Sequence, residues 1–398
     1  MDRTGRRLAV LILAAALAIR VAWVLATPDY QLVHDAIDYH NHAASIAAGD
    51  GYALSYGRET AFRPPAYPYF LAAVYVFTGP DVVAARIANA FVGTAIVALI
   101  GVVAFQIWGQ RVALVAMALG AVYVPLILVG QAVMSEPLFA LCMLGAIAAA
   151  LKRWSVVAGI LLGLAILGRP NAIILLAPLA WAVWRGPRPA VALVVAAALT
   201  VMPWTIRNAI VLDHFVPVST QLGSALAGTY NSNARADKEN PASWRSLKRV
   251  DDYQDIFSRV RETNEAVLEK QLRDAALEFI REHPGYVGTV AFWTTRRMLD
   301  LAGMDWSIHT ASTISVGRKA AIAGVICFWI YAVLAIAGAF TRRARAAPLW
   351  LWVVPLLMYL SVVFLVVETP RYRTAIDPFI VLLAALALAR AAERPRIP

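Results

Sequence analysis

Charged residues are scarce in this sequence. Asp, Glu, Lys and Arg make up only 15% of its 398 residues, whereas 60% are hydrophobic. Soluble domains carry about a quarter of charged residues, so this composition excludes an ordinary soluble protein. Runs of Ala, Leu, Val and Ile recur along almost the whole chain. They predict an all-α polytopic membrane protein.

Cysteine is also rare, with two residues in the whole chain. Cys142 and Cys327 both lie within apolar segments, so we expect small hydrophobic side chains and no disulfide framework. The sequence contains neither a nucleotide-binding glycine loop nor a nucleophile elbow. If the protein is an enzyme, it must therefore obtain an activated donor from the membrane or from its outer side.

Acidic residues are outnumbered by basic ones, and the formal net charge is +11. In a soluble protein this charge would suggest nucleic-acid binding. Here the basic residues gather at the ends of apolar segments, as the positive-inside rule of membrane proteins expects, so we predict no nucleic-acid partner. The most basic ends, which we predict to be cytoplasmic, include Arg3, Arg6, Arg7, Arg342, Arg343 and Arg345.

Apolar segments predict about ten transmembrane helices with both termini inside. They cover residues 8–26, 82–108, 112–129, 134–151, 156–168, 171–184, 190–212, 320–340, 350–367 and 375–389. The apolar segment 66–78 is too short to cross, because about 13 residues cover only about 20 Å of a ~30 Å core. We expect it at the outer surface or half inserted.

The first apolar segment has an alternative interpretation as a cleaved signal peptide, with Ala26 near the cleavage site. Arg20 within this segment and the many later segments favour an uncleaved anchor.

Three regions follow from this pattern. We predict an N-terminal membrane module at 1–212 with a first outer loop at 27–81, an outer region at 213–318, and C-terminal membrane helices at 319–398. In a bacterium the outer side of the inner membrane is the periplasm. The outer region carries a helical pattern of apolar residues: Ile256, Val260, Val267, Leu272, Ala275, Phe279 and Ile280. Residues 286–301 suit a helix along the interface.

Ionisable residues stand at the outer ends of the predicted spans, where a charge beside the bilayer usually has a function. We expect one cavity in which acids transfer protons and arginines hold an anionic group. The candidate acids are Asp35, Asp38 and Glu136, and the candidate anion-binding residues are Arg63, Arg169, Arg207, Arg371, Tyr372 and Arg373.

Several of these residues have other interpretations. His34, Asp38 and His42 would share one face of a helix and are weak candidates for a divalent metal site. Asp35 is also a candidate helix cap, and Glu136 before Pro137 would favour a helix N-terminus. Arg169 and Arg207 have an alternative role at phospholipid head groups.

The motifs together resemble a known family, the polyprenyl-phosphate-sugar-dependent glycosyltransferases of the GT-C fold, related to protein O-mannosyltransferases and the lipid A aminoarabinose transferase. The resembling residues are Asp35, Asp38-Tyr39, Ala44, Gly49-Asp50-Gly51-Tyr52, Phe62-Arg63-Pro64-Pro65-Ala66-Tyr67-Pro68, Ser135-Glu136-Pro137-Leu138, Gly168-Arg169-Pro170-Asn171, Arg207-Asn208, Pro217-Val218-Ser219-Thr220, Gly223 and Arg371-Tyr372. The aminoarabinose transferase has an acid before the basic residue of the corner, where this chain has Phe62.

The resemblance implies a GT-C fold with juxtamembrane helices in the first outer loop and a small, mostly helical periplasmic insertion. It implies inverting transfer of a sugar from a polyprenyl-phosphate donor to a hydroxyl acceptor at the periplasmic face. Asp35 matches the general base and Arg63 the residue that meets the lipid phosphate. Arg371 and Tyr372 match a motif near the donor, and Glu136 an acid that orients acceptor or sugar.

Two other functions remain open from the residues alone. A secondary transporter or lipid flippase would also line a cavity with charge, but would show inverted repeats and helices broken at mid-membrane. A polysaccharide ligase or polymerase would act on the same kind of polyprenyl carrier. A purely structural membrane protein would leave the charged outer ends unexplained.

Overall fold

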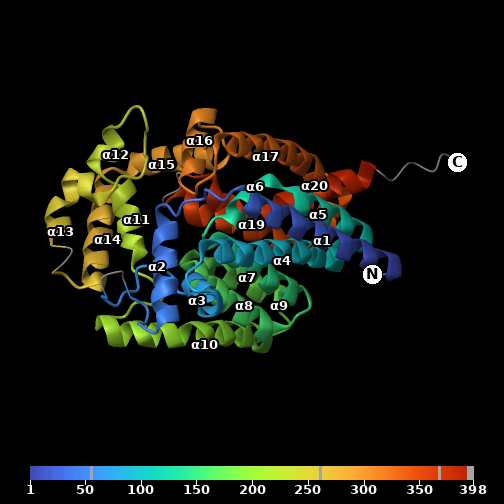
Figure 1. The fold of residues 1–398 in the computed structure, drawn as a ribbon, viewed down its shortest axis with the longest axis horizontal. Helices are drawn as coiled ribbons and strands as arrows, with labels where there is room; N and C mark the ends of the chain where they lie inside the picture. The colour runs from blue at the N-terminus through green and yellow to red at the C-terminus, as the bar shows by residue number, and fades with distance from the viewer. Residues whose placement is uncertain (54–56, 260–261, 366–368, 392–398) are drawn as a thin grey trace.

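The computed structural model describes residues 1–53, 57–259, 262–365 and 369–391 (Figure 1). Within these ranges the chain folds into α-helices and short 3-10 helices, with one isolated antiparallel bridge between Ala53 and Glu59 and no strand. The predicted all-α class is confirmed.

Four described helices are long and apolar enough to cross a membrane: α1 (Arg3–Ala26), α4 (Val82–Trp108), α10 (Pro187–Leu212) and α17 (Arg318–Ala339). A fifth candidate is a bent pair, α5 (Gln110–Val122) and α6 (Val124–Gln131). The shorter apolar helices are α3 (Ala66–Thr78), α7 (Glu136–Leu151), α8 (Ser155–Gly168), η1 (Pro170–Leu175) with α9 (Leu176–Val183), α19 (Leu349–Val363) and α20 (Asp377–Ala391).

The predicted count of about ten transmembrane helices is therefore not confirmed. Among the described residues, four helices meet the length requirement, or five with the bent pair. The 16 residues of α7 would span about 24 Å at the helical rise, less than a ~30 Å core. The short helix predicted at 66–78 is observed as α3. The end of the predicted segment 350–367 lies outside the described residues.

The predicted segment 112–129 is bent because proline interrupts it. α5 and α6 meet at 54°, and Pro125 stands in the first turn of α6. Proline lacks the N–H that would bond the preceding turn. Arg20 of α1, fully buried, donates instead to the carbonyls of Ala121 at 3.2 Å and Gly120 at 3.4 Å. The arginine inside the first apolar segment thus satisfies backbone carbonyls beside the bend.

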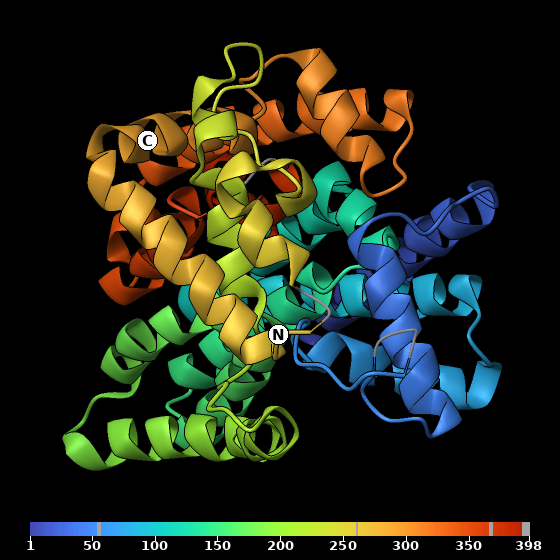
Figure 2. The ribbon, with the colours of Figure 1, turned by 90° about the vertical axis from the view of Figure 1, so that its left-hand side faces the viewer.

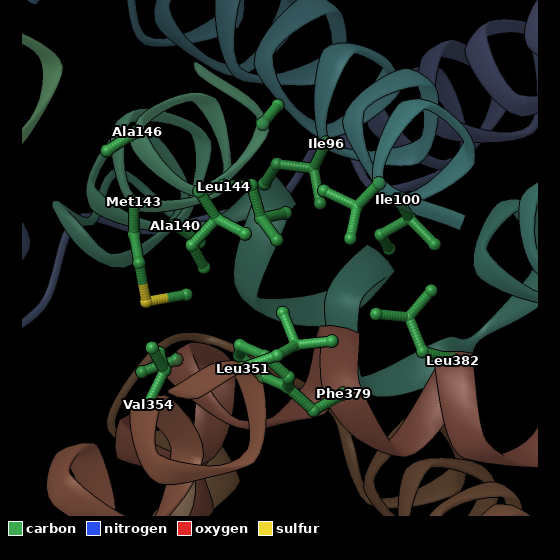
Figure 3. Close-up of a cluster of buried hydrophobic side chains, with 14 of the residues drawn as sticks. Ile96, Ile100, Ala140, Met143, Leu144, Ala146, Leu351, Val354, Phe379 and Leu382 are labelled. Carbon is green, nitrogen blue, oxygen red and sulfur yellow. The ribbon is translucent and has the colours of Figure 1, made fainter. Parts of the chain in front are cut away.

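The apolar helices form one bundle. α7 packs against α4 and α8, α8 against α10, and α17 along α20. Figure 3 shows side chains of α4, α7, α19 and α20 meeting in its core. The labelled residues of this core are Ile96, Ile100, Ala140, Met143, Leu144, Ala146, Leu351, Val354, Phe379 and Leu382.

Helices of the 213–318 region cover one end of the bundle. The N-terminus and the end of α20 lie at the opposite end, whereas α2 (Asp35–Ala48) lies at the covered end, packed against α3 (Figure 1). Figure 2 looks onto the covered end and shows α14 in front of the bundle helices. The remaining helices are α11 (Gln221–Thr229), α12 (Ser232–Ala236), η2 (Leu247–Arg249), η3 (Asp251–Tyr253), α13 (Gln254–Ser258), α14 (Glu265–Glu282), α15 (Pro284–Met298), α16 (Met304–Ser312) and α18 (Arg342–Ala346).

The apolar pattern at 256–280 forms two helices rather than one. α13 ends at Ser258 and α14 begins at Glu265. Asn264 caps the second helix, since its side chain accepts a hydrogen bond from the N–H of Ala266. Leu272 and Ala276 of α14 are buried in the core of this region, whereas Val260 lies outside the described residues.

Gly338 provides a test of the α17–α20 contact. A Cβ at this position would lie 1.9 Å from the carbonyl oxygen of Leu383, so Gly338→Ala must push the two helices apart. We expect it to lower the free energy of unfolding by about 1–3 kcal/mol. Unfolding in mixed SDS micelles measures this. The control is Gly288→Ala in α15, where no heavy atom lies within 4 Å. Equal stability of the two variants would contradict the close packing.

Candidate active site

Polar segments that are distant in the sequence meet beside α2. They are the start of α2 with Asp35 and Asp38, the Arg63 corner, and the 3-10 helix η4 (Pro370–Ala375). The start of α7 joins them through Glu136. Asp35 and Glu136 are the first residues of α2 and α7, and Asp38 lies in the first turn of α2. At these positions the helix dipole favours a negative charge.

Proline and hydrogen bonds to the main chain set the direction of the two central arginines. Pro64 and Pro65 follow Arg63 and delay helix formation until Ala66. The Tyr52 hydroxyl donates to the Arg63 carbonyl at 2.7 Å. On the other side, the Thr369 hydroxyl accepts from the N–H of Arg371 at 3.2 Å.

Arg63 holds both acids of α2. Its Nη2 lies 2.7 Å from Oδ1 of Asp35 and 2.6 Å from Oδ2 of Asp38, and its Nε lies 3.1 Å from the same Asp38 oxygen. One planar guanidinium group thus pairs with two carboxylates, and Nε and Nη2 converge on a single oxygen of Asp38.

Arg371 contacts the other carboxylate oxygen of Asp35. Its Nη2 donates to Oδ2 of Asp35, and its Nε lies 3.4 Å from Oε1 of Glu136. Arg169 adds a contact of 3.0 Å to the same Glu136 oxygen. Three carboxylates and three guanidinium groups therefore form one alternating chain: Asp38, Arg63, Asp35, Arg371, Glu136 and Arg169.

This arrangement keeps Asp35 ionised. Burial raises the pKa of its carboxyl group, but the guanidinium groups of Arg371 and Arg63 lower it by more, to well below its usual range. Burial lowers the pKa of Arg63, but Asp35, Tyr39 and Asp38 together outweigh this effect and raise it. In this state Asp35 is a weak base whose proton affinity depends on its two arginines.

The three acidic side chains differ in their exposure to solvent. The Asp35 and Asp38 side chains are 26% and 40% exposed, whereas that of Glu136 is 3% exposed. A substrate can therefore reach Asp35 and Asp38, while Glu136 orients Arg169 and Arg371 from within. The cap of α2 is His34, whose side chain makes no cap hydrogen bond. The partners of Asp35 are side chains, so the helix-cap interpretation does not describe this residue.

Aromatic rings line the guanidinium groups. Arg63 lies 5.4 Å from the ring centre of Tyr39 and 5.2 Å from that of Phe62. Arg169 lies 4.7 Å from the ring centre of Tyr372, which places Tyr372 at the site. Such rings attract a cation and limit its contact with water.

Two of the arginines expected at the site make other contacts. Arg207 donates to the carbonyls of Thr60 at 2.6 Å and Tyr52 at 3.1 Å, so it supports the backbone that leads to Arg63. Arg373 is buried in a second group, with Asp300 at 3.0 Å and Asp377 at 2.9 Å. It also donates to the Met298 carbonyl at 2.6 Å, which attaches η4 to the end of α15.

The metal candidates are not brought together. His34 precedes α2, and Nδ1 of His42 lies 2.6 Å from the main-chain oxygen of Asp38. In the described part of the chain no three His, Cys, Asp or Glu side chains form a group suited to a metal ion. A role for a divalent ion stays a prediction.

A small cavity, partly open to the surroundings, adjoins Arg371. Its walls come from α6, α16 and α17, and η4 forms one end. Leu128, Val129, Ala321 and Val325 make one part apolar, whereas Arg371 lies at the polar end. The cavity thus brings apolar side chains next to Arg371.

Sequence reasoning missed Glu265, Asp300 and Asp377. Asp377 follows Arg373 by four residues, and this helical spacing was a usable signal. Glu265 follows a helix cap, but its partners Thr220 and Thr60 lie 45 and 205 residues away. Asp300 carries no local signal. Only the tertiary structure brings Glu265 and Asp300 to their partners.

Comparison with solved structures identifies the fold of this chain. No protein-family model matches the sequence, and no curated protein matches it. Among solved structures, the chain is similar to the archaeal oligosaccharyltransferase AglB of Archaeoglobus fulgidus, solved with an inhibitory peptide and a dolichol-phosphate. The TM-score is 0.58 at 15% identity, over 98% of this chain and 51% of AglB. The chain thus spans about half the length of AglB.

ArnT of Cupriavidus metallidurans is also similar. Bound to undecaprenyl phosphate, it has a TM-score of 0.47 at 16% identity, over 98% of this chain and 79% of ArnT. We base the fold assignment on AglB, because its TM-score exceeds 0.5. The chain has the GT-C fold, the helical fold of membrane-embedded glycosyltransferases, as the sequence resemblance implied.

The low pKa of Asp35 predicts a pH-dependent stability. Because folding lowers this pKa, the ionised carboxylate stabilises the fold above pH about 4, and this contribution is lost as the pH falls towards the folded value. We expect the difference in melting temperature between wild type and Asp35→Asn to shrink below pH about 4. Thermal unfolding in detergent at pH 3 to 7 measures it, with the exposed Asp50→Asn as control. A pH-independent difference would contradict the ion-pair assignment.

The buried group around Arg373 predicts a large loss of stability. Arg373→Gln leaves Asp300 and Asp377 without their cation, and removing one partner of a buried pair costs about 3–5 kcal/mol. Unfolding in mixed SDS micelles would show this, whereas the exposed Arg345→Gln should change little. Similar stability of both variants would mean that the group contributes nothing.

Proposed function

We propose that this protein is an integral-membrane inverting glycosyltransferase that moves a sugar from a polyprenyl-phosphate donor to a hydroxyl group of a protein, lipid or glycan. It acts in the inner membrane of a bacterium, with both termini cytoplasmic and the site facing the periplasm. One observation carries the proposal: the partly exposed Asp35 carboxylate is shared between Arg63 and Arg371. A base and two anion-binding groups are in direct contact.

Phosphate is the anion that suits this site best. Arg63 and Arg371 each donate one N–H group to a different oxygen of Asp35, and guanidinium groups bind phosphate oxygens with paired hydrogen bonds. AglB, whose fold this chain shares, was solved with a dolichol-phosphate. That complex supports a polyprenyl phosphate as partner.

The cavity beside Arg371 suits the carrier chain. Its apolar part lies between α6 and α17, and its polar end adjoins the arginine. A prenyl chain in the apolar part would bring the phosphate to Arg371. Binding the chain would hold the sugar next to Asp35, and such positioning lowers the barrier of a reaction between two molecules.

The transfer step uses Asp35 as general base. The acceptor hydroxyl gives its proton to the Asp35 carboxylate, and its oxygen forms a bond to the anomeric carbon from the face opposite the phosphate. The bond from this carbon to the phosphate oxygen breaks, and its electron pair stays on the phosphate. Arg63 and Arg371 stabilise the charge that develops there. Attack from the opposite face inverts the configuration.

Donor binding also activates the base. In the structure both arginines hold the pKa of Asp35 low. A phosphate competes for the same N–H groups, so their charge is shared and the pKa of Asp35 rises towards its usual range. Asp35 then takes up a proton more readily. Glu136 stays paired with Arg169 and keeps that part of the chain of ion pairs in place.

The places of the chain ends and of the 213–318 helices in the fold support the proposed orientation in the membrane. The N-terminus and the end of α20 lie at one end of the bundle, and the 213–318 helices lie at the other (Figure 1). The basic segment Arg342–Ala346 follows α17 and lies beside α20. The positive-inside rule assigns such short basic segments to the cytoplasm.

A transfer assay tests the proposal. Purified protein in lipid receives polyprenyl-phosphate sugars and a mixed acceptor extract. Removing a general base costs about 10²–10⁴ in rate, so we expect Asp35→Asn to lose kcat by about that factor while it still binds undecaprenyl phosphate. Asp29→Asn, exposed and in the same loop region, should keep wild-type rates.

Other outcomes of the same assay are equally informative. Full activity of Asp35→Asn would shift the base to Asp38 or Glu136. Substrate movement across the bilayer without transfer would favour a transporter or flippase, for which the bend between α5 and α6 is a suitable feature. Parallel reactions with a chelator show whether a divalent ion contributes.

A further inference from the structure

Glu265 connects the 213–318 region to the segment before Arg63. Oε2 of Glu265 accepts from the Thr60 hydroxyl at 2.5 Å, and Oε1 accepts from the N–H of Ala61 at 3.0 Å. The Thr220 hydroxyl donates to Oε1 at 2.5 Å. A single carboxylate at the start of α14 thus receives three donors from two distant parts of the chain.

Further contacts hold the same segment. The N–H of Thr220 donates to the Ala61 carbonyl at 3.1 Å, and Nη2 of Arg58 donates to the Thr263 carbonyl at 3.1 Å. Thr60 and Ala61 are fully buried. The segment therefore has a defined place between α10, α14 and Thr220.

The position of Arg63 depends on this attachment. The N–H of Phe62 donates to the Thr60 hydroxyl oxygen at 2.9 Å, which closes a turn just before Arg63. The same hydroxyl donates to Glu265. Together with the bond from Tyr52 to the Arg63 carbonyl, these contacts fix the backbone on both sides of the residue that holds Asp35 and Asp38.

An ionised carboxylate suits this contact, because all three partners donate to it and it has only acceptor oxygens. The N–H of Ala61 can only donate, whereas the two threonine hydroxyls can also accept. Hydrogen bonds to an ionised group are about twice as strong as neutral ones. Glutamine has a similar shape and can keep these partners, with its NH₂ group turned towards the Thr60 hydroxyl, but its hydrogen bonds are neutral and therefore weaker.

We infer that Glu265 is a positioning residue, through which the 213–318 region holds Arg63 in its place on Asp35 and Asp38. The outer region thereby regulates the affinity of the site for the donor phosphate. The part that concerns the phosphate rests on the proposed function. The structural part, the attachment of residues 60–63 to α14, does not.

Hydrogen exchange tests the attachment without any ligand. In the full-length protein, Glu265→Gln should speed exchange of the amides at 60–63 by about tenfold, because the N–H of Ala61 loses a charged acceptor. The matched control is Glu278→Gln, the same change at an exposed position of the same helix. Unchanged exchange at 60–63 would overturn the inference.

Binding of undecaprenyl phosphate tests the consequence at the site. We expect Glu265→Gln to weaken binding by about tenfold, and Glu278→Gln to leave it unchanged. If Glu265 acts through Arg63, the double variant with Arg63→Gln binds no more weakly than Arg63→Gln alone. Additive losses would overturn the inference. Wild-type protein that binds no polyprenyl phosphate would refute the proposed function, and hydrogen exchange would then decide the attachment.

A second pair of variants covers the case in which Glu265→Gln does not fold. Thr220→Val removes one donor to Glu265, and Thr220→Ser keeps it. Faster exchange at 60–63 in the valine variant, restored to the wild-type rate by serine, supports the inference. Equal exchange in both variants overturns it.

Discussion

The Asp35 carboxylate, shared between Arg63 and Arg371, is the contact on which the rest of the site depends. Its two arginines come from opposite ends of the sequence, and each is held by separate parts of the fold. A buried charge is tolerated in a protein only when it is paired. The pairing therefore brings the start of α2, Arg63, the start of α7 and η4 into one place.

Arginine has three different uses in this chain. Arg20 donates to backbone carbonyls beside the bend of α5 and α6, and Arg373 joins η4 to the ends of α15 and α20. Arg371, two residues before Arg373, meets the partly exposed Asp35 of the site. Since neighbouring arginines serve different purposes, charge at the end of a span does not by itself identify a ligand-binding residue.

Much of the fold could be predicted from local pattern. The short helix at 66–78 has the expected bounds, and the first loop forms a helix from Asp35 onwards. The number of transmembrane spans could not be predicted in this way, because several apolar helices are shorter than a bilayer core and one segment bends at Pro125. The split between α13 and α14 depends on the Asn264 cap, a local signal that the apolar periodicity obscured.

The sequence by itself determined the helical membrane class and the position of ionisable residues at helix ends, because apolar periodicity and the cost of burying charge act locally. Only the tertiary structure decided which charges meet. Glu265 lies 204 residues from Ala61, and Arg371 lies 336 residues from Asp35. Contacts at such separations depend on how the helices pack, and no short stretch of sequence contains that information.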